Sequence, residues 1–363
     1  MPFATSRTVP VPWPDAFPGR GHAAYLDTAS IGLVPAQAGA AAARCYEALG
    51  AGVRGMARTR AAVERTRTLL AEEFGCTAQD IVFASSTGEA VNAVARAISW
   101  QQGDEVLALD DEFPTVSQPW SKLPGVRLVT VPAGPDDDRT SALMRAIGPH
   151  TRLVAVSHVS SHTGTAVDLA ALGAACASAG ALLLCDGAQA AGVLPVVSAQ
   201  ADFYVATGYK WMLAGFGIAF LIIKAPVRDT LEPTLLGHAN IPPSRNLAVG
   251  TPNLAGVHAL GAAAELRRTV GHQAITERAT GLAARIRDEA QALGFRPAGH
   301  SGHVSQIVSL VPPGLPAGSW VTRLEGADVI VAERGGRLRI SPHFYTTDSD
   351  VDALLLALSH PHA

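Results

Sequence analysis

Two stretches, Leu182-Leu-Leu-Cys-Asp-Gly-Ala-Gln189 and Ala206-Thr-Gly-Tyr-Lys-Trp211, decide the fold of this 363-residue chain. In the first, a run of apolar residues ends on Asp186, as in a buried strand that stops at a carboxylate. In the second, a short apolar run delivers Lys210 in a tight glycine turn. We therefore expect two strands that bring a carboxylate and an amine to the same edge of a sheet.

The pair Asp186 and Lys210 fits the chemistry of pyridoxal phosphate. This cofactor needs an amine that forms a Schiff base with it and an acid that keeps its pyridinium nitrogen protonated. Neither residue is diagnostic alone, because a lysine beside a glycine is usually a solvated turn residue and a strand-end aspartate is most often a helix cap. The other motifs of the chain therefore carry part of the assignment.

The composition restricts the class of protein. With 48% apolar and 16% charged residues, the chain can bury a large core, and its length suggests about two domains. A net charge of −3 and the lack of a dense Lys/Arg run offer no basic face, so we expect no nucleic-acid partner. The longest apolar stretch, 211–223, is too short to span a bilayer, and the N-terminus lacks the apolar run of a signal peptide. The four cysteines show no CxxC spacing, and we expect no metal site. Together these features predict a cytoplasmic protein without membrane association.

Short apolar runs alternate with helical patterns over the first two thirds of the chain. The expected strands are 80–85, 105–109, 126–131, 152–158, 181–185, 203–206 and 218–223, with helices at 89–100 and 168–179 between them. Alternating strands and helices with nearly continuous apolar strands indicate an α/β fold. Its sheet should have seven mainly parallel strands with helices on both faces.

The pattern changes after a proline-rich stretch at 226–252. A long helical region, 256–294, carries an apolar seam at Ala259, Ala262, Ala263 and Leu266, and strands at 306–310, 328–331 and 337–340 precede a helix at 349–358. This order predicts a smaller α+β domain. The expected organisation is an N-terminal arm (1–24), a large cofactor-binding domain (25–258) and a small C-terminal domain (259–363).

Several polar residues follow strands and are expected at the same sheet edge. Ser85-Ser-Thr-Gly-Glu89 begins a helix and could hold a phosphate on its free N–H groups, or could simply provide an N-cap. His158 ends a strand, where a catalytic or a merely hydrogen-bonded histidine are both possible. Phe113 could stack on a flat ring or anchor the core. Gln189 could face the same ligand as Asp186, or face solvent.

Arginine is the residue best suited to a substrate carboxylate, because its guanidinium donates two parallel hydrogen bonds. Arg339 alternates with apolar neighbours in the segment Gly336-Arg-Leu-Arg-Ile-Ser-Pro-His343. Arg337 has the same strand parity and is the rival candidate. A surface ion pair is the alternative for either.

The chain resembles the class V aminotransferase group of fold-type I pyridoxal-phosphate enzymes, which includes cysteine desulfurases, kynureninases, isopenicillin-epimerase-like proteins and C–S lyases. The resemblance runs from Tyr25-Leu-Asp-Thr-Ala-Ser30 to Arg339-Ile-Ser-Pro-His-Phe-Tyr345. Its specific signature is Asp186-Gly-Ala-Gln189 together with Thr207-Gly-Tyr-Lys210. The weaker motifs occur in the expected order.

The resemblance implies a role for each site residue. Lys210 forms the Schiff base and then shuttles the Cα proton, Asp186 pairs with the pyridine nitrogen, and His158 joins them in the catalytic set. Further residues are implied to contact the phosphate, the ring face or the ring hydroxyl of the cofactor. They are Thr87, Gly88, Phe113, Ser161, Gln189, Thr207, Tyr209 and Thr251. Arg339, Thr28 and Ser30 are implied in substrate binding. Thr251 would reach the phosphate of a partner subunit, so a homodimer with shared active sites is expected.

Three departures from the family pattern bear on function. Ser161 stands where the family has an asparagine, so one contact to the ring hydroxyl is lost or made through water. Tyr209 precedes the lysine, where desulfurases carry histidine and kynureninases carry tyrosine. From Gly294 to Ala363 there is no cysteine, whereas a desulfurase needs a nucleophilic one on a loop of the small domain.

The favoured function is a C–S lyase that acts by β-elimination on an S-substituted cysteine. It would resemble the lyases of the ergothioneine pathway and release pyruvate, ammonia and a thiol-type product. A pyridoxal-phosphate-dependent aminotransferase or amino-acid epimerase is the alternative. A cysteine desulfurase is disfavoured by the missing cysteine, and a non-enzymatic cofactor-binding protein is disfavoured by the complete Lys, Asp, Gln and Arg set. The sequence leaves the substituent on the substrate sulfur open.

Overall fold

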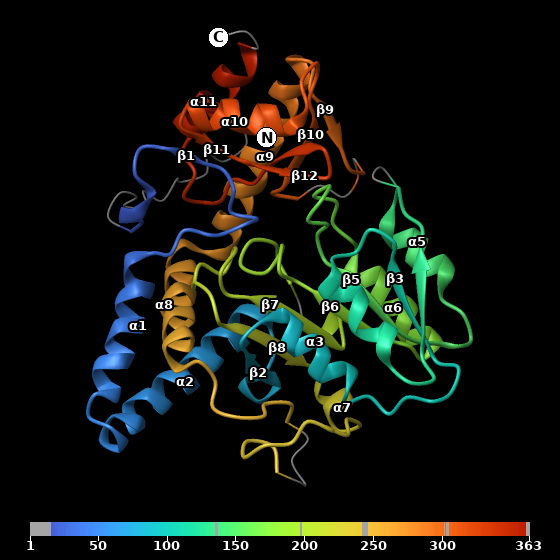
Figure 1. Ribbon diagram of the computed structural model, residues 1–363. Coiled ribbons are helices and arrows are strands. Elements are labelled where there is room, and N and C mark those ends of the chain that lie inside the picture. The colour runs from blue at the N-terminus through green and yellow to red at the C-terminus, as the bar shows by residue number, and fades with distance from the viewer. Residues whose placement is uncertain are drawn as a thin grey trace, which may run out of the picture.

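The computed structural model describes residues 16–134, 137–196, 198–241, 246–300, 302 and 305–360. Figure 1 shows a large part built around a wide sheet and a smaller C-terminal part that lies above it. Residues 1–15 of the expected N-terminal arm lie outside the described residues. Of the arm, the structure describes a short 3-10 turn (η1, Pro18–Arg20) and the start of strand β1 (Ala24–Tyr25).

The seven-stranded sheet confirms the predicted α/β class. Its spatial order is β2 (Ile81–Ala84), β8 (Ala219–Ile223), β7 (Phe203–Thr207), β6 (Leu182–Asp186), β5 (Thr151–Ser157), β3 (Glu105–Leu109) and β4 (Arg127–Val131). The strands from β7 to β4 are parallel to one another, while β8 runs antiparallel to both of its neighbours. The carboxyl ends of β5, β6 and β7 therefore lie side by side at one edge.

Helices cover both faces of this sheet. They are α1 (Ala36–Leu49), α2 (Val53–Phe74), α3 (Thr87–Ala95), α4 (Pro114–Ser117), α5 (Arg139–Ala146), α6 (Leu169–Ala179), α7 (Ala225–Arg228) and α8 (Leu254–Val270). The helix expected at 89–100 begins two residues earlier, because Ser86 caps its first turn by accepting the N–H of Glu89. It ends at Ala95.

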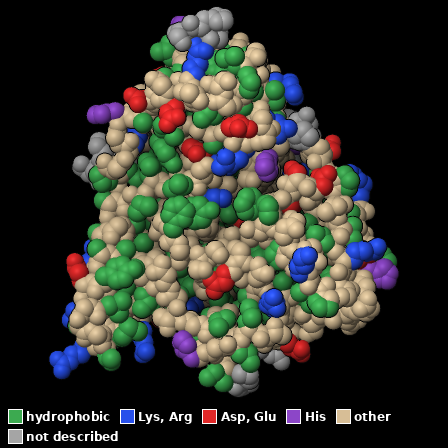
Figure 2. Space-filling model, in the orientation of Figure 1, with side chains coloured by type: hydrophobic (Ala, Val, Ile, Leu, Met, Phe, Trp, Pro, Cys, Tyr) green, Lys and Arg blue, Asp and Glu red, His purple; other side chains and the backbone are tan. Residues whose placement is uncertain are grey.

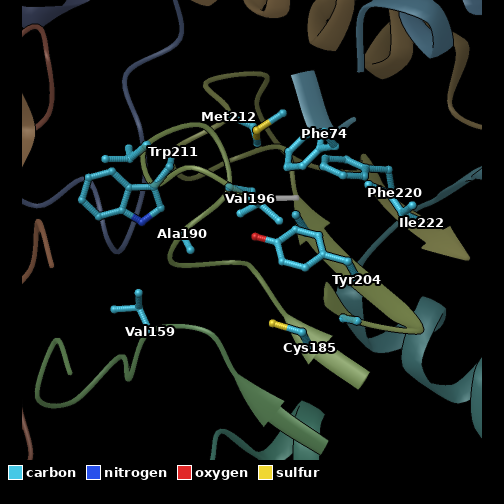
Figure 3. Packing of buried hydrophobic residues seen from close by; sticks show 14 of the residues in the cluster. Phe74, Val159, Cys185, Ala190, Val196, Tyr204, Trp211, Met212, Phe220 and Ile222 are labelled. Atoms are coloured by element: carbon cyan, nitrogen blue, oxygen red, sulfur yellow. The ribbon is translucent and has the colours of Figure 1, made fainter. Parts of the chain in front are cut away.

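The two faces of the sheet bury separate clusters of apolar side chains. Cys185 and Tyr204 point to the face covered by α2, where Phe74 lies 5.7 Å from the ring of Tyr204 and 5.2 Å from that of Phe220 (Figure 3). Leu184 and the α3 side chains belong to the cluster on the other face. Successive residues of β6 thus alternate between the two faces, as a strand requires.

The smaller part holds a four-stranded antiparallel sheet in the order β12 (Ala332–Arg334), β13 (Arg337–Ile340), β10 (Val308–Val311) and β9 (Arg296–Ala298). Helices α9 (His272–Ala292), α10 (Ala317–Gly326) and α11 (Asp348–Ser359) pack with it. The strand expected at 328–331 is divided, since β11 (Val329–Ile330) pairs with β1 and the next residues pair with β13.

The domain boundary predicted at residue 259 lies within helix α8. The predicted seam residues Ala259 and Ala263 lie in the core of the large part, where α8 contacts α1 and α2. Helix α9 begins in that core with Ile275 and ends in the core of the smaller part with Ile286. Leu26 also belongs to the smaller core. We propose that the division falls within α9 and that the first strand belongs with the small domain.

Acidic and basic side chains are interspersed over the face seen in Figure 2, with a group of hydrophobic side chains near its middle. Among the helices that the structure describes, none combines the length and the apolar character that a bilayer span requires.

A buried ion pair fixes α8 and α2 to the segment that carries the site. The fully buried guanidinium of Arg267 donates to the Glu73 carboxylate through Nε at 3.0 Å and Nη2 at 2.7 Å. Its Nη1 donates to the carbonyl oxygen of Met212 at 2.7 Å. Because Met212 follows Lys210 by two residues, this arginine ties the lysine turn to the helical layer.

Replacing Arg267 with alanine should lower the free energy of unfolding by about 3–5 kcal/mol, because Glu73 would remain buried without its partner. The pair Arg267→Met and Glu73→Leu together should recover most of that loss, since no charge stays buried. Urea denaturation followed by circular dichroism measures both changes. Equal losses in the single and double variants would contradict this account.

Candidate active site

The ends of β5, β6 and β7 enclose a cavity that is lined by both Asp186 and Lys210. Its lining residues are Thr87, Phe113, Ser157, Val159, Ser161, Asp186, Ala188, Gln189, Thr207, Tyr209 and Lys210. Most of the residues implied in cofactor binding therefore meet in one place, although they come from distant stretches of the chain.

Asp186 ends β6 and is buried, with its Oδ1 accepting the N–H of Ala188 at 2.8 Å. Burial raises its pKa to about 6, and Glu112 adds to the rise, while the Ala188 hydrogen bond and the nearby Lys210 lower it. A cation held against this carboxylate would stabilise its charged form. The protonated nitrogen of a pyridine ring is such a cation.

Lys210 follows β7 in a turn where backbone segments approach closely. The N–H of Gly208 donates to the carbonyl oxygen of Ile218 at 2.8 Å, and that of Gly32 donates to Tyr209 at 2.8 Å. A side chain on Gly32 would overlap the carbonyl oxygen of Lys210, so this position requires glycine. The lysine turn is thus held from two sides.

Burial lowers the pKa of Lys210 to about 8, an effect strengthened by Arg339 and Arg334 and opposed by Asp186. Its Nζ lies 5.9 Å from the ring centroid of Phe113 and 5.6 Å from that of Tyr209. An amine that is partly neutral near neutral pH can add to an aldehyde, as Schiff-base formation requires.

The start of α3, where a phosphate cradle was predicted, lies at the cavity. Ser86 serves as the N-cap, so the capping alternative is true of that residue, while Thr87 lines the cavity. Gly88 follows it in the first turn, where a Cβ would meet only distant atoms. The buried hydroxyl of Thr207 has no hydrogen-bond partner among the described residues. Free helix N–H groups and an unsatisfied hydroxyl fit an anion such as a phosphate.

Three further lining residues suit a flat ring. Phe113 is 47% exposed and presents its ring to the cavity. The amide of Gln189 accepts from Trp211 Nε1 at 2.7 Å and donates to the carbonyl oxygen of Ala29 at 3.1 Å, which leaves one N–H for a ring hydroxyl. Ser161 also lines the cavity. Tyr209 stacks on Phe216 at 4.5 Å and is held beside the lysine.

His158, which was predicted to belong to the catalytic set, does not line this cavity. Ser157 pairs in register with Asp186 and points with it into the cavity, so the next residue, His158, points to the opposite face. There its ring packs edge-on against Tyr204 at 6.4 Å, and burial lowers its pKa to about 4. We assign His158 a packing role.

Arg339 contacts Ser161 of the cavity wall and is 2% exposed. Its Nη2 donates to Ser30 Oγ at 2.6 Å and to Asp27 at 3.2 Å, and its Nη1 donates to the carbonyl oxygen of Ser161 at 3.4 Å. Its Nε has no partner among the described residues. Ser30 thus contacts Arg339, whereas Thr28 is buried and bonded to the Tyr345 hydroxyl at 2.7 Å.

Thr251 lies away from the cavity of its own chain. It is exposed, and its hydroxyl lies 3.4 Å from His238 Nε2. A contact from Thr251 to a cofactor phosphate therefore requires a second subunit.

The structure also identifies Glu112, which the sequence analysis did not single out. Its buried carboxylate accepts the hydroxyl of Ser157 at 2.6 Å, the N–H of Ser157 at 2.9 Å and the N–H of Phe113 at 3.2 Å. The adjacent Arg139 also donates to it, at 3.4 Å. An acid immediately before the stacking aromatic was the available signal. Glu112 fixes the aromatic to the end of β5.

Comparison with known proteins agrees with this geometry. The model of the aminotransferase class-V family matches residues 24–354. Isopenicillin N epimerase of Amycolatopsis lactamdurans is 30% identical over 80% of this chain and 83% of its own length. A probable cysteine desulfurase of Methanothermobacter thermautotrophicus is 26% identical over 91% and 92% of the two chains.

Solved structures show the same fold. The apo structure of a cysteine desulfurase from Thermococcus onnurineus NA1 superposes with a TM-score of 0.89 at 26% identity, over 99% of both chains. The cystine C–S lyase C-DES, in complex with cysteine persulfide, has a TM-score of 0.87 at 23% identity over 94% and 99% of the two chains, a likeness of fold. The chain belongs to the class-V aminotransferase family of fold-type I enzymes, and its cofactor is pyridoxal 5'-phosphate.

Proposed function

We propose that the protein is a C–S lyase that cleaves an S-substituted cysteine by β-elimination to pyruvate, ammonia and a thiol, similar to the lyases of the ergothioneine pathway. The observation that carries this proposal is the placement of the cysteines. None of the four, Cys45, Cys76, Cys176 and Cys185, lines the cavity at Lys210.

Burial raises the pKa of every one of these thiols. That of Cys76 rises to about 11 and that of Cys176 to about 12, and those of Cys45 and Cys185 also rise. Cys185 neighbours Asp186 in sequence but points to the other face of the sheet. A persulfide-forming desulfurase needs a thiolate that attacks the substrate sulfur. The elimination route needs none.

The chain's own residues suffice for the elimination. Bound pyridoxal phosphate withdraws electrons from the Cα of an amino acid through its protonated ring. Asp186 holds the proton at the ring nitrogen, Thr87 and Thr207 bind the phosphate, and Phe113 covers the ring. Lys210 Nζ removes the proton from Cα, the C–S bond breaks with its electron pair on sulfur, and the thiol leaves with a proton. Water then converts the three-carbon fragment to pyruvate and ammonia.

An amino-acid epimerase is the second candidate. It is favoured by the 30% identity to isopenicillin N epimerase. The same lysine would remove the Cα proton, but a proton would return to the opposite side of Cα and no bond to sulfur would break. An aminotransferase would instead pass the amino group to a keto acid.

A panel of cysteine S-conjugates separates these reactions. The lyase should release pyruvate and ammonia in equal amounts from at least one conjugate without added keto acid. Lys210→Ala should abolish both, together with the visible absorption band of the cofactor, while Arg296→Gln on an exposed edge strand should change neither. Exchange of the Cα proton in deuterium oxide without pyruvate would make the protein an epimerase. Turnover that depends on a keto acid would make it an aminotransferase.

The lowered pKa of Lys210 predicts how the apoprotein takes up pyridoxal phosphate. Only the neutral amine adds to the aldehyde, so the rate of appearance of the visible band should rise with pH around a midpoint of about 8. Asp186→Asn should move this midpoint lower, because the carboxylate raises the pKa of Lys210. A midpoint near the ordinary lysine value, unchanged in the variant, would contradict the assignment. Stopped-flow absorbance measures the rate.

We propose a homodimer with shared sites on the basis of the segment around Thr251. Large apolar side chains are exposed close to it in sequence, including Leu236, Ile241 and Val249. Exposed apolar residues of this kind are typical of subunit contacts. A hydroxyl carried there could reach a neighbouring subunit's cofactor.

Complementation tests the shared site. Lys210→Ala and Thr251→Asp should each be inactive at limiting cofactor, the second because a carboxylate repels the phosphate. Mixed dimers of the two should regain activity, because one site per dimer then combines the native Lys210 with the native Thr251. No recovery after subunit exchange, with dimers seen in light scattering, would place Thr251 outside the site.

A further inference from the structure

A second cavity, of about 580 Å³, adjoins the cofactor cavity and shares Phe113 with it. Its wall includes Asp111, Glu112, His162 and Arg337. None of these residues is among those that we expect to hold pyridoxal phosphate. A substrate whose amino end lies at Lys210 could extend its side chain past Phe113 into this space.

Arg337 is held at the wall by a tight hairpin. Gly335 and Gly336, with φ of 56° and 73°, form the two-residue turn between β12 and β13, and Arg334 pairs with Arg337 across it. Both turn positions require glycine-like geometry, so the hairpin fixes where Arg337 emerges. A Cβ on Gly335 would lie 3.7 Å from Arg337 Nη1 and 3.8 Å from His162 Nδ1. The guanidinium and the imidazole therefore lie against the same glycine.

Both acids of this cavity have Arg139 as an ion-pair partner. Arg139, which is 2% exposed, donates to both oxygens of Asp111 at 2.8 and 2.7 Å and also contacts Glu112. The side chain of Arg337, by contrast, makes no ion pair or hydrogen bond with any described residue. The unpaired charge on the wall is thus positive.

Arg337 belongs to a group of cations on one face of the small sheet. Arg334 stands directly opposite it, and Arg339 follows two residues later with the same parity. Like charges opposite one another on neighbouring strands are unfavourable. Within the described chain only Arg339 of the three has a carboxylate partner, Asp27. The group is therefore short of negative charge.

We propose that Arg337, with His162 beside it, binds an anionic group at the far end of the substrate side chain. Arg339 then takes the α-carboxylate. Resting on the proposed lyase function, this makes the substrate a cysteine whose S-substituent ends in a carboxylate. Residues at positions i and i+2 of one strand, such as Arg337 and Arg339, have Cα atoms roughly 6.5–7 Å apart. The five bonds between the carboxyl carbons of S-(carboxymethyl)cysteine span about 6–7 Å when extended, which matches that spacing.

Three amino acids with one six-carbon skeleton test the proposal without any elimination. In 2-aminoadipate a methylene replaces the sulfur of S-(carboxymethyl)cysteine. Where 2-aminoadipate has its distal carboxylate, norleucine carries a methyl group and lysine carries a protonated aminomethyl group. Calorimetry with the holoenzyme, without keto acid, gives their Kd values. The wild type should bind 2-aminoadipate at least about tenfold more tightly than norleucine, as expected of a charge-assisted hydrogen bond, and lysine most weakly.

Variants identify the residue responsible. Arg337→Gln should bring the Kd of 2-aminoadipate close to that of norleucine and leave norleucine unchanged. Arg337→Lys should retain most of the preference, since the charge remains. Arg296→Gln, on the exposed edge strand β9 of the same sheet, is the matched control and should behave as the wild type.

Each opposing result has a definite meaning. Equal affinity for 2-aminoadipate and norleucine in the wild type would overturn the proposal, and a preference for lysine would instead assign the cavity to Asp111 and a cationic substrate. If Arg337→Gln weakened all three ligands equally, Arg337 would bind the α-carboxylate. An Arg337-dependent preference in a protein that releases no pyruvate from any conjugate would refute the lyase function alone.

Discussion

The burial of Asp186 and Lys210 in one small cavity is the constraint on which the rest of the site depends. Desolvation pushes both side chains toward their neutral forms, raising the pKa of the acid to about 6 and lowering that of the amine to about 8. A carboxyl group and an amine whose charged forms are both disfavoured by burial suit a cationic ring that also carries an aldehyde. Asp186 would hold the protonated ring nitrogen of the cofactor, and Lys210 would hold its aldehyde carbon.

This constraint explains which features the sequence revealed. Asp186 and Lys210 end adjacent strands, so their separation in sequence translates directly into proximity once the sheet is parallel. Thr207, Tyr209 and Gln189 come along with them, because each lies within a few residues of one of the pair. The seven strands were predicted for the same reason, since doubly covered parallel strands are apolar throughout and stand out in the sequence.

The features that the sequence left open depend on strand register and packing. The position of His158 depends on strand parity, because Ser157 is in register with Asp186 and the histidine therefore lies on the Tyr204 face. Arg337 and Arg339 lie on the same face of their strand, so only burial distinguishes them. Arg337 is half-buried at the hairpin, whereas Arg339 is buried and bonded to Ser30. The apolar seam of α8 would suit the core of either domain, so the sequence pattern does not say which one it joins. Its partners α1 and α2 are distant in sequence.

Asp27 holds Arg339, the proposed receptor of the substrate carboxylate, in place. An arginine buried this deeply without a counter-ion would be costly, and burial does lower its pKa while Asp27 raises it again. Because Asp27 and Ser30 occupy Nη2 and Ser161 accepts from Nη1, the plane of the guanidinium is fixed before substrate arrives. A preoriented group loses little entropy on binding, so part of the cost of recognition is met during folding. The contact also crosses from the N-terminal segment to the small domain, which makes the geometry of the substrate site depend on how those two elements dock.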